Sequence, residues 1–284
     1  MSLIIVTSSS PGEGKTGVAA AIARHYAYLG RSVRLVRGAS PGRATEDASY
    51  FATLAFAPGS TSEPAPVTDP GGDSLVVAET DIAGAAVAGA KVVFVARGSA
   101  PARLPDGIVP AAIVITDVRR SAGPPAGGAT PIIQLNEDRC LAGFSVSDAR
   151  TALSAEVLVV GDGGDPTCDH LVIAPISSDA GQPYFRRFES NAVVVRFDKT
   201  DMHLAAMQAD PACLILTGGR RPSDYLFDAA TAKGVPVMLS RTDTENTVIA
   251  LEGIFDSTRF QGERKLDRMA ALLEGSGLFE ALDR

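Results

Sequence analysis

The chain has 284 residues, of which 45% are hydrophobic and 21% charged, so it is long enough for two medium domains that each bury a core. Its formal net charge of -7 argues against nucleic acid as the main partner. The three cysteines, Cys140, Cys168 and Cys213, are widely spaced and form no CxxC pair, which argues against a disulfide framework or a thiolate metal site. We therefore expect a cytoplasmic protein with no membrane partner.

The first element predicted is a buried strand over Leu3–Val6, followed by the segment Thr7–Thr16 and a helix-period run that ends near Gly30. A glycine-rich turn between a strand and a helix can aim successive backbone N–H groups at one anion. The segment therefore predicts a phosphate-binding loop, in which Lys15 reaches the terminal phosphates and Thr16 ligates Mg²⁺. Ser9 replaces the usual first glycine, and an ordinary glycine-rich turn is the alternative. The residues expected to contact the nucleotide here are Gly12, Glu13, Gly14, Lys15, Thr16 and Gly17.

Further apolar runs alternate with loops through the first half of the chain. Residues 41–50 are predicted as a loop that leads into a short helix through Tyr50–Phe56, and 58–72 as irregular. Runs this apolar are typical of a parallel sheet with helices on both faces, so the fold class expected is α/β. The remaining strands of this sheet are expected at Ser32–Val36, Leu75–Ala78, Val92–Ala96, Ala112–Ile115 and Ile132–Ile133.

Two carboxylates follow these strands and are candidate metal ligands. Glu79 comes directly after the strand Leu75–Ala78, at the edge where open α/β sheets hold ligands. Asp47 lies in the predicted loop after the second strand and could fold back over the phosphate loop. The alternatives are a solvated turn carboxylate for Glu79 and a helix N-terminal charge for Asp47.

In these motifs, residues 1 to about 120 resemble the dethiobiotin-synthetase-like branch of the P-loop NTPases. The resemblance implies ATP as ligand, Lys15 and Thr16 on the phosphates and Mg²⁺, and Asp47 and Glu79 as further metal-side carboxylates. The sequence of Pro11–Lys15 is also similar to that of related bacterial P-loop ATPases. The chain departs from the family at two places: Arg37 stands where the family has a substrate-binding lysine, although Arg37 is still expected to clamp an anion of the ligand, and Thr116-Asp117 stand where it has a base-reading asparagine.

The strand and helix pattern repeats in the second half of the chain. Strands are expected at 157–160, 171–174, 192–195, 213–216 and 235–239, and helices at 147–153, 183–188, 201–208, 223–232 and 245–254. The segment Gly262–Asp283 is predicted as an amphipathic helical tail, broken near Gly275. The domains expected are 1–140, 141–260 and a tail over 261–284.

Three polar loops of this half follow strands, and parallel strands would bring them to one edge of a sheet. They contain Asp198-Lys199-Thr200, Thr217-Gly218-Gly219-Arg220-Arg221 and Arg241-Thr242-Asp243-Thr244. Helix N-termini and basic side chains there could bind a small anion, with Thr217, Gly218, Gly219 and Arg220 as contacts. The alternative is that the glycines serve the turn and the arginines are solvated or pair with Asp198, Asp224 and Asp243.

Residues from about 155 to 260 resemble a DRTGG domain, the module found beside dethiobiotin-synthetase-like domains at the front of some phosphate acetyltransferases. The segments on which this resemblance rests are Ala174–Ser178, Asp198–Asp201, Leu214–Gly219, Gly234–Val237 and Asp243-Thr244. The whole is similar to phosphotransacetylase-family or cobyrinic acid a,c-diamide synthase-like proteins, and a homodimer is implied. No acetyltransferase domain follows in the sequence, so that activity is not expected.

Together these patterns predict a two-domain protein that binds ATP and Mg²⁺, with a regulatory or ligand-sensing second domain and, at most, slow ATP hydrolysis with Lys15 as the catalytic residue. Two other functions stay open. One is an ATP-dependent ligase resembling dethiobiotin synthetase, and the other is a non-catalytic scaffold with a vestigial nucleotide site.

Overall fold

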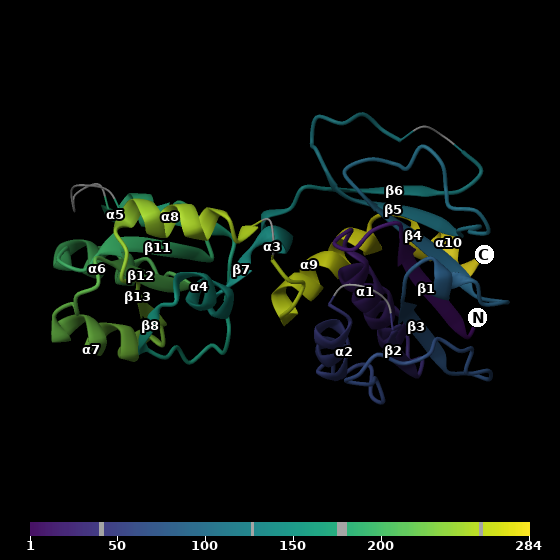
Figure 1. Cartoon of the computed structure of the whole chain (residues 1–284), viewed down its shortest axis with the longest axis horizontal. Coiled ribbons are helices and arrows are strands. Elements are labelled where there is room, and N and C mark those ends of the chain that lie inside the picture. Colours follow the sequence, from purple (N-terminus) through teal and green to yellow (C-terminus); the bar gives the residue numbers. More distant parts are fainter. Residues whose placement is uncertain (40–42, 126–127, 175–180, 256–257) are drawn as a thin grey trace. The chain divides into compact units, whose positions relative to one another are not determined.

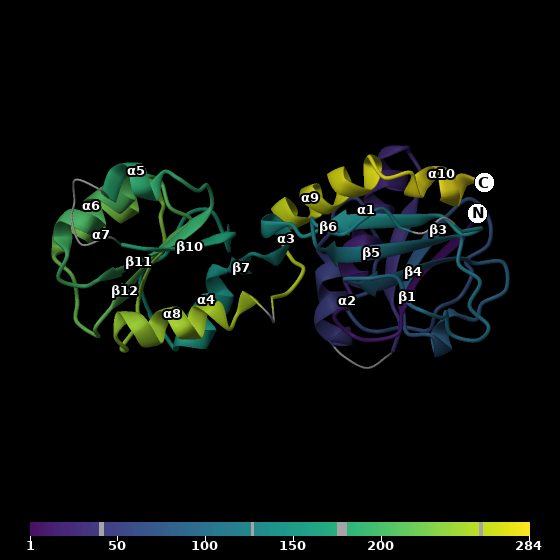
Figure 2. The ribbon, with the colours of Figure 1, turned by 90° about the horizontal axis from the view of Figure 1, so that it is seen from above.

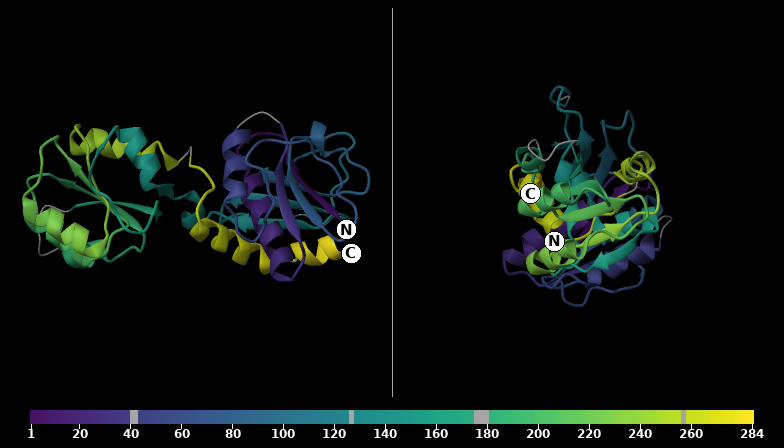
Figure 3. Two further views of the ribbon diagram at one scale, coloured as in Figure 1. Left: turned by 90° about the horizontal axis from the view of Figure 1, so that it is seen from below. Right: turned by 90° about the vertical axis from the view of Figure 1, so that its left-hand side faces the viewer.

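The computed structural model describes residues 1–39, 43–125, 128–174, 181–255 and 258–284. The chain divides into two compact units: unit 1 comprises Met1–Asp138 and Lys265–Arg284, and unit 2 comprises Arg139–Arg264. The two ends of the chain both lie in unit 1, where they are close together (Figure 3). Among the described residues, no helix has the length and apolar character needed to cross a membrane.

Unit 1 is built on a six-stranded parallel sheet with the strand order β2-β3-β1-β4-β5-β6 (Figure 1). The strands are mainly apolar and largely buried, as expected for a parallel sheet, except that the edge strand β6 is partly exposed. The six strands lie where the sequence predicts them. Their bounds are Leu3–Ser8 (β1), Val33–Arg37 (β2), Leu75–Glu79 (β3), Lys91–Arg97 (β4), Ala112–Val118 (β5) and Ile132–Asn136 (β6).

Helices flank this sheet, and the C-terminal pair packs beside α1 (Figure 2). His25 of α1 stacks on Phe279 with ring centroids 3.5 Å apart, and the Tyr26 hydroxyl donates to Asp283 over 2.8 Å. These contacts explain why the tail belongs to unit 1. The helices of this unit are α1 (Lys15–Tyr28), α2 (Ala44–Ala52), α9 (Glu263–Glu274) and α10 (Leu278–Asp283), with a short 3-10 turn η1 (Ala83–Ala85).

Another part of the unit 1 core is closed by connecting segments. Strand residues such as Ile5 and Phe94 pack there against Ala65, Ile82 and Leu104, all of which lie between strands. The connecting segments between strands therefore contribute apolar side chains to the core that packs against the sheet.

The prediction for residues 41–56 is wrong in its helix boundaries. The helix α2 spans Ala44–Ala52, so Asp47 lies in its first turn and not in a loop. Ala48 and Phe51 are fully buried on the inner side of α2, and this packing starts the helix more than one turn earlier than the sequence pattern indicates. Residues 40–42 lie outside the described part.

Unit 2 is a smaller α/β region with a five-stranded sheet of order β10-β11-β12-β13-β8, in which only β8 is antiparallel to its neighbour. A two-stranded sheet joins β7 to β9. The strands are Phe144–Ser145 (β7), Glu156–Val159 (β8), Thr167–Cys168 (β9), His170–Ile173 (β10), Asn191–Arg196 (β11), Cys213–Thr217 (β12) and Val237–Leu239 (β13).

Helices cover both faces of the five-stranded sheet. One core cluster packs α5, α6 and α7 on Val193, Leu214 and Val237, and a second packs α4 and α8 on the alternate residues Val194 and Ile215. Figure 2 shows the two helix layers on opposite sides of these strands. The helices are α3 (Arg139–Ala142), α4 (Val146–Leu153), α5 (Gly181–Phe185), α6 (Thr200–Gln208), α7 (Asp224–Lys233) and α8 (Thr244–Glu252).

Candidate functional site

The loop between β1 and α1 has the backbone form of an anion-binding turn. Gly12 and Gly14 adopt φ angles of 80° and 94°, in the left-handed region that glycine enters without steric cost. Gly14 is the N-cap of α1, and with no side chain it leaves the first N–H groups of this 14-residue helix uncapped. Open N–H groups and the helix dipole favour a negative ligand at this position.

Lys15 is the first residue of α1, and its side chain folds back over the loop. Its Nζ donates to Ser8 Oγ over 2.6 Å and to the Ser10 carbonyl over 3.3 Å. Burial lowers the pKa of Lys15, while the charge of Glu79 opposes that shift. Ser8 was not among the residues expected in the site, although a hydroxyl at the end of the strand before the loop was a visible signal.

Thr16 and Glu79 meet because β1 and β3 are neighbouring parallel strands. Glu79 is the last residue of β3, and the Thr16 side chain in the first turn of α1 is near enough to this carboxylate to favour its charged form and so lower its pKa. Glu79 is only 2% exposed, and its Oε2 has no hydrogen-bond partner among the described residues. Burial raises the pKa of Glu79 to about 7, against the opposing charge of Arg37. The alternative of a solvated turn carboxylate is therefore wrong.

Arg37, the last residue of β2, joins the two candidate carboxylates. Its Nε lies 3.3 Å from Asp47 Oδ2 and 3.5 Å from Glu79 Oε1, and its NH1 donates to the Gly38 carbonyl over 2.8 Å. The Arg37 side chain is 3% exposed. Burial raises the pKa of Asp47, and Arg37 counteracts this rise. Because arginine keeps its proton, a fixed positive charge lies between the carboxylates.

The oxygen atoms of this site fit in part what Mg²⁺ requires. Among the described residues, no group of three or more His, Cys, Asp or Glu side chains could hold a metal ion. Mg²⁺ in nucleotide sites, however, needs one or two carboxylates, with phosphate oxygens and water completing the shell. The Thr16 hydroxyl and the unpartnered Glu79 Oε2 fit that donor set. Asp47, held by Arg37, fits less directly.

Thr116, near the end of β5, holds the phosphate loop in place. Its Oγ1 donates to the Glu13 carbonyl over 2.8 Å. Its Cγ2 lies 3.1 Å from the point where a Cβ on Gly14 would be, so the loop packs tightly on this side chain. The sequence marks Thr116 only as a departure from the asparagine of the resembling family, and its role as an anchor depends on the strand order.

In unit 2, the three polar loops come together as the parallel strands require. A Cβ on Gly218 would lie 2.8 Å from the Phe197 ring, and one on Gly219 would lie 3.3 Å from the Arg241 carbonyl oxygen. The Gly218 N–H donates to the Thr242 carbonyl and the Gly219 N–H to the Ser240 carbonyl. These two amides are therefore used inside the fold, so the glycines serve the turn.

Some of the polar side chains at this edge of the sheet have partners within unit 2. The Thr217 hydroxyl lies 2.8 Å from that of Thr244, and the Arg220 guanidinium lies over the Phe197 ring, 5.7 Å from its centroid. Asp243 accepts from Asn246 N and so caps α8. Lys199 is exposed. An anion at this edge would thus contact basic side chains rather than the glycine backbone.

Comparison with known proteins identifies unit 2. The family model of the DRTGG domain matches residues 148–254. The chain contains a DRTGG domain. The resemblance of residues 155–260 to that domain is thereby confirmed, although most of the carrying segment Ala174–Ser178 lies outside the described residues.

One solved structure is also similar to part of the chain. It is the crystal structure of the CBS and DRTGG domains of the regulatory region of Clostridium perfringens pyrophosphatase, complexed with the activator diadenosine tetraphosphate. The identity is 17%, the TM-score is 0.37, and the match covers 43% of this chain. It spans about half of that structure's chain, 53% of its length.

Proposed function

We propose that unit 1 binds a nucleoside triphosphate with Mg²⁺ on the loop between β1 and α1, and that the DRTGG domain gives this binding a regulatory or ligand-sensing role. ATP is the nucleotide that the family resemblance implies. The pairing of Thr16 with the buried Glu79 carboxylate carries the proposal, because one oxygen of that carboxylate has no partner among the described residues.

Each part of the proposed site has a separate role in binding the nucleotide and Mg²⁺. The Gly12–Gly14 turn and the N-terminus of α1 receive the phosphates, and Lys15 exchanges its bonds to Ser8 and Ser10 for phosphate oxygens. Thr16 and Glu79 would hold Mg²⁺, which neutralises phosphate charge when bound. Arg37 keeps Asp47 and Glu79 close together and can also clamp an anion.

Binding is favoured here over catalysis. Arg37 occupies the position where the ligases of the resembling family have a lysine, and an arginine paired with the buried Glu79 and the half-buried Asp47 is a poor substitute in substrate chemistry. Slow hydrolysis of ATP, with Lys15 stabilising the charge that develops on the phosphates, is compatible with the same arrangement. A homodimer remains an expectation from the resemblance.

Calorimetric titration of the intact chain with ATP and Mg²⁺ tests the proposal. We expect saturable binding that Lys15→Ala weakens at least tenfold, because the lysine ammonium lies against the loop, where it donates to the Ser10 carbonyl. Lys233→Ala is the matched control, since that lysine lies in unit 2 and pairs with Asp210. Absence of binding of any nucleoside triphosphate by the folded native chain, or equal weakening by both variants, would refute it.

A further inference from the structure

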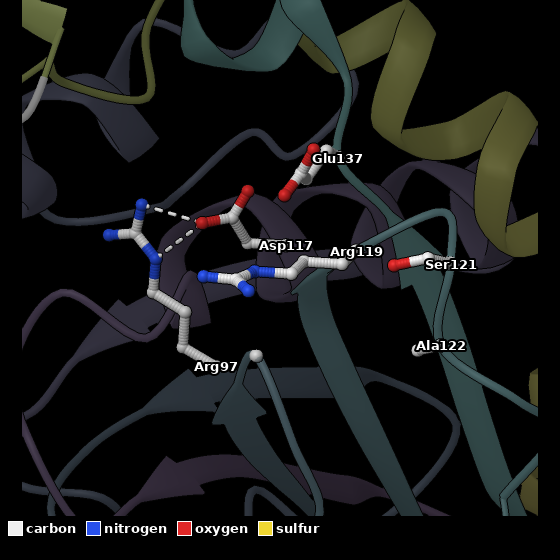
Figure 4. A pocket seen from close by; sticks show the side chains of 7 residues that line it. Arg97, Asp117, Arg119, Ser121, Ala122 and Glu137 are labelled. Atoms are coloured by element: carbon white, nitrogen blue, oxygen red, sulfur yellow. Dashed lines mark hydrogen bonds and ion pairs between the residues drawn. The ribbon is translucent and has the colours of Figure 1, made fainter.

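A cavity of unit 1 lies at the carboxyl ends of β4, β5 and β6. It has a volume of about 510 Å³ and is lined by charged side chains from all three strand ends (Figure 4). Arg97 comes from β4, Asp117 and Arg119 from β5 and the residues after it, and Glu137 from the residue after β6. Its volume is in the range of small-molecule sites, roughly 300 to 1,000 Å³.

The cavity is connected to the phosphate loop through a single residue. Thr116, which directly precedes Asp117, donates from its hydroxyl to the Glu13 carbonyl. The Thr116 carbonyl in turn accepts from the N–H of Gly98, which also lines the cavity, over 2.7 Å. A ligand that places its phosphates on the loop can therefore extend its other end along the same sheet edge into this cavity.

Asp117 is held in an unusual backbone conformation at the cavity wall. Its φ is 56°, and the pairing of β5 with β6 changes register between Ile115 and Val118. Such bulges redirect a side chain, and strained residues cluster at ligand sites. The Asp117 carboxylate points to Arg97 and accepts from its Nε over 2.9 Å. This ion pair forms one side of the cavity.

Two further charged side chains line the cavity, and both are exposed. Neither the Arg119 guanidinium nor the Glu137 carboxylate has a side-chain partner among the described residues. Figure 4 shows Arg119 beside the Arg97–Asp117 pair and Glu137 on the other side of Asp117. A neutral group that forms hydrogen bonds with both side chains must offer N–H donors to the Glu137 carboxylate and acceptors to the Arg119 guanidinium.

Guanine has this combination. Its N1–H and N2 amine are adjacent donors that a carboxylate can accept together, and its O6 and N7 are acceptors suited to a guanidinium. Adenine presents the unprotonated N1 beside its single amine, so a carboxylate facing that edge is repelled by N1. We propose that this cavity holds the nucleotide base and selects guanine over adenine, with Glu137 and Arg119 as the selective residues. This inference rests on the proposed nucleotide site.

Competitive titration of the full chain with GTP, ATP and inorganic tripolyphosphate, all with Mg²⁺, tests this inference. We expect GTP to bind at least tenfold more tightly than ATP, and Glu137→Gln and Arg119→Ala each to reduce that ratio at least threefold. Tripolyphosphate affinity should be the same in all variants, because it contacts only the loop. Arg120→Ala is the matched control, being an exposed neighbour outside the cavity lining.

The outcomes separate this inference from the proposed function. Tripolyphosphate binding with an ATP affinity equal to or higher than that of GTP would overturn guanine selection and leave the phosphate loop intact. A preference for GTP that survives both substitutions would overturn the assignment to this cavity. If none of the three probes bound, the proposed function itself would fail.

Discussion

Replacement of Glu79 by glutamine should stabilise unit 1 at neutral pH. The Glu79 carboxyl has an ordinary pKa of 4.5, and burial raises its pKa in the folded chain to about 7. Between these two values the folded state keeps a proton that the unfolded state has lost. The free energy of unfolding therefore falls as the pH rises from about 4.5 to about 7. Glutamine keeps the shape of the protonated carboxyl and does not titrate.

The magnitude follows from the pKa shift. One pKa unit corresponds to about 1.4 kcal/mol, so this shift amounts to roughly 3 kcal/mol. Glu79→Gln should match the native chain in stability at pH 4 and exceed it by about that amount at pH 8. Arg37 is already included in this figure, because its attraction for the ionised carboxylate limits the rise of the pKa.

The assay must follow unit 1 separately from unit 2. The chain has no tryptophan, so urea unfolding is best monitored by hydrogen exchange of peptides from β1, β3 and α1 at pH 4 and pH 8. Glu137→Gln is the matched control, because that carboxylate is exposed. A Glu79→Gln chain that is less stable than native at pH 8, or that shows the native pH dependence, would refute the reasoning.

Three further expectations follow from the same contacts. Metal-dependent nucleotide affinity should weaken as the pH falls from 8 to 6 in calorimetric titration, because Glu79 takes up a proton there, and a flat profile would exclude Glu79 as a ligand. Thr116→Val removes the bond to the Glu13 carbonyl and should lower both the nucleotide affinity several-fold and the stability by about 1 kcal/mol, which titration and thermal unfolding would show. Gly218→Ala, at φ 94° and against Phe197, should destabilise unit 2 by more than about 1 kcal/mol in urea, and by more than Gly262→Ala, which has a similar φ of 86° but open space around it.

The arrangement of the loops in unit 2 was predictable only in part. The rhythm of apolar runs predicts parallel strands, and parallel strands bring Lys199, Gly218 and Arg241 to one edge. The sequence could not indicate which partners the Gly218 and Gly219 amides take, because Ser240 and Thr242 follow a different strand. These amide partners decide whether the turn binds an anion or is purely structural. They are hydrogen bonds between segments that are distant in the sequence, so local sequence patterns do not reveal them.

The sequence by itself determined the local parts of the candidate site: the strand, the glycine turn that needs left-handed φ angles, and the Lys15-Thr16 pair that begins the helix. These follow from steric and hydrogen-bonding rules that act over a few residues. Only the tertiary structure decided which distant groups meet them. The strand order places Glu79 against Thr16, puts Arg37 between two carboxylates, and turns Thr116 into an anchor for the loop, because neighbours in a sheet are set by packing of the whole chain.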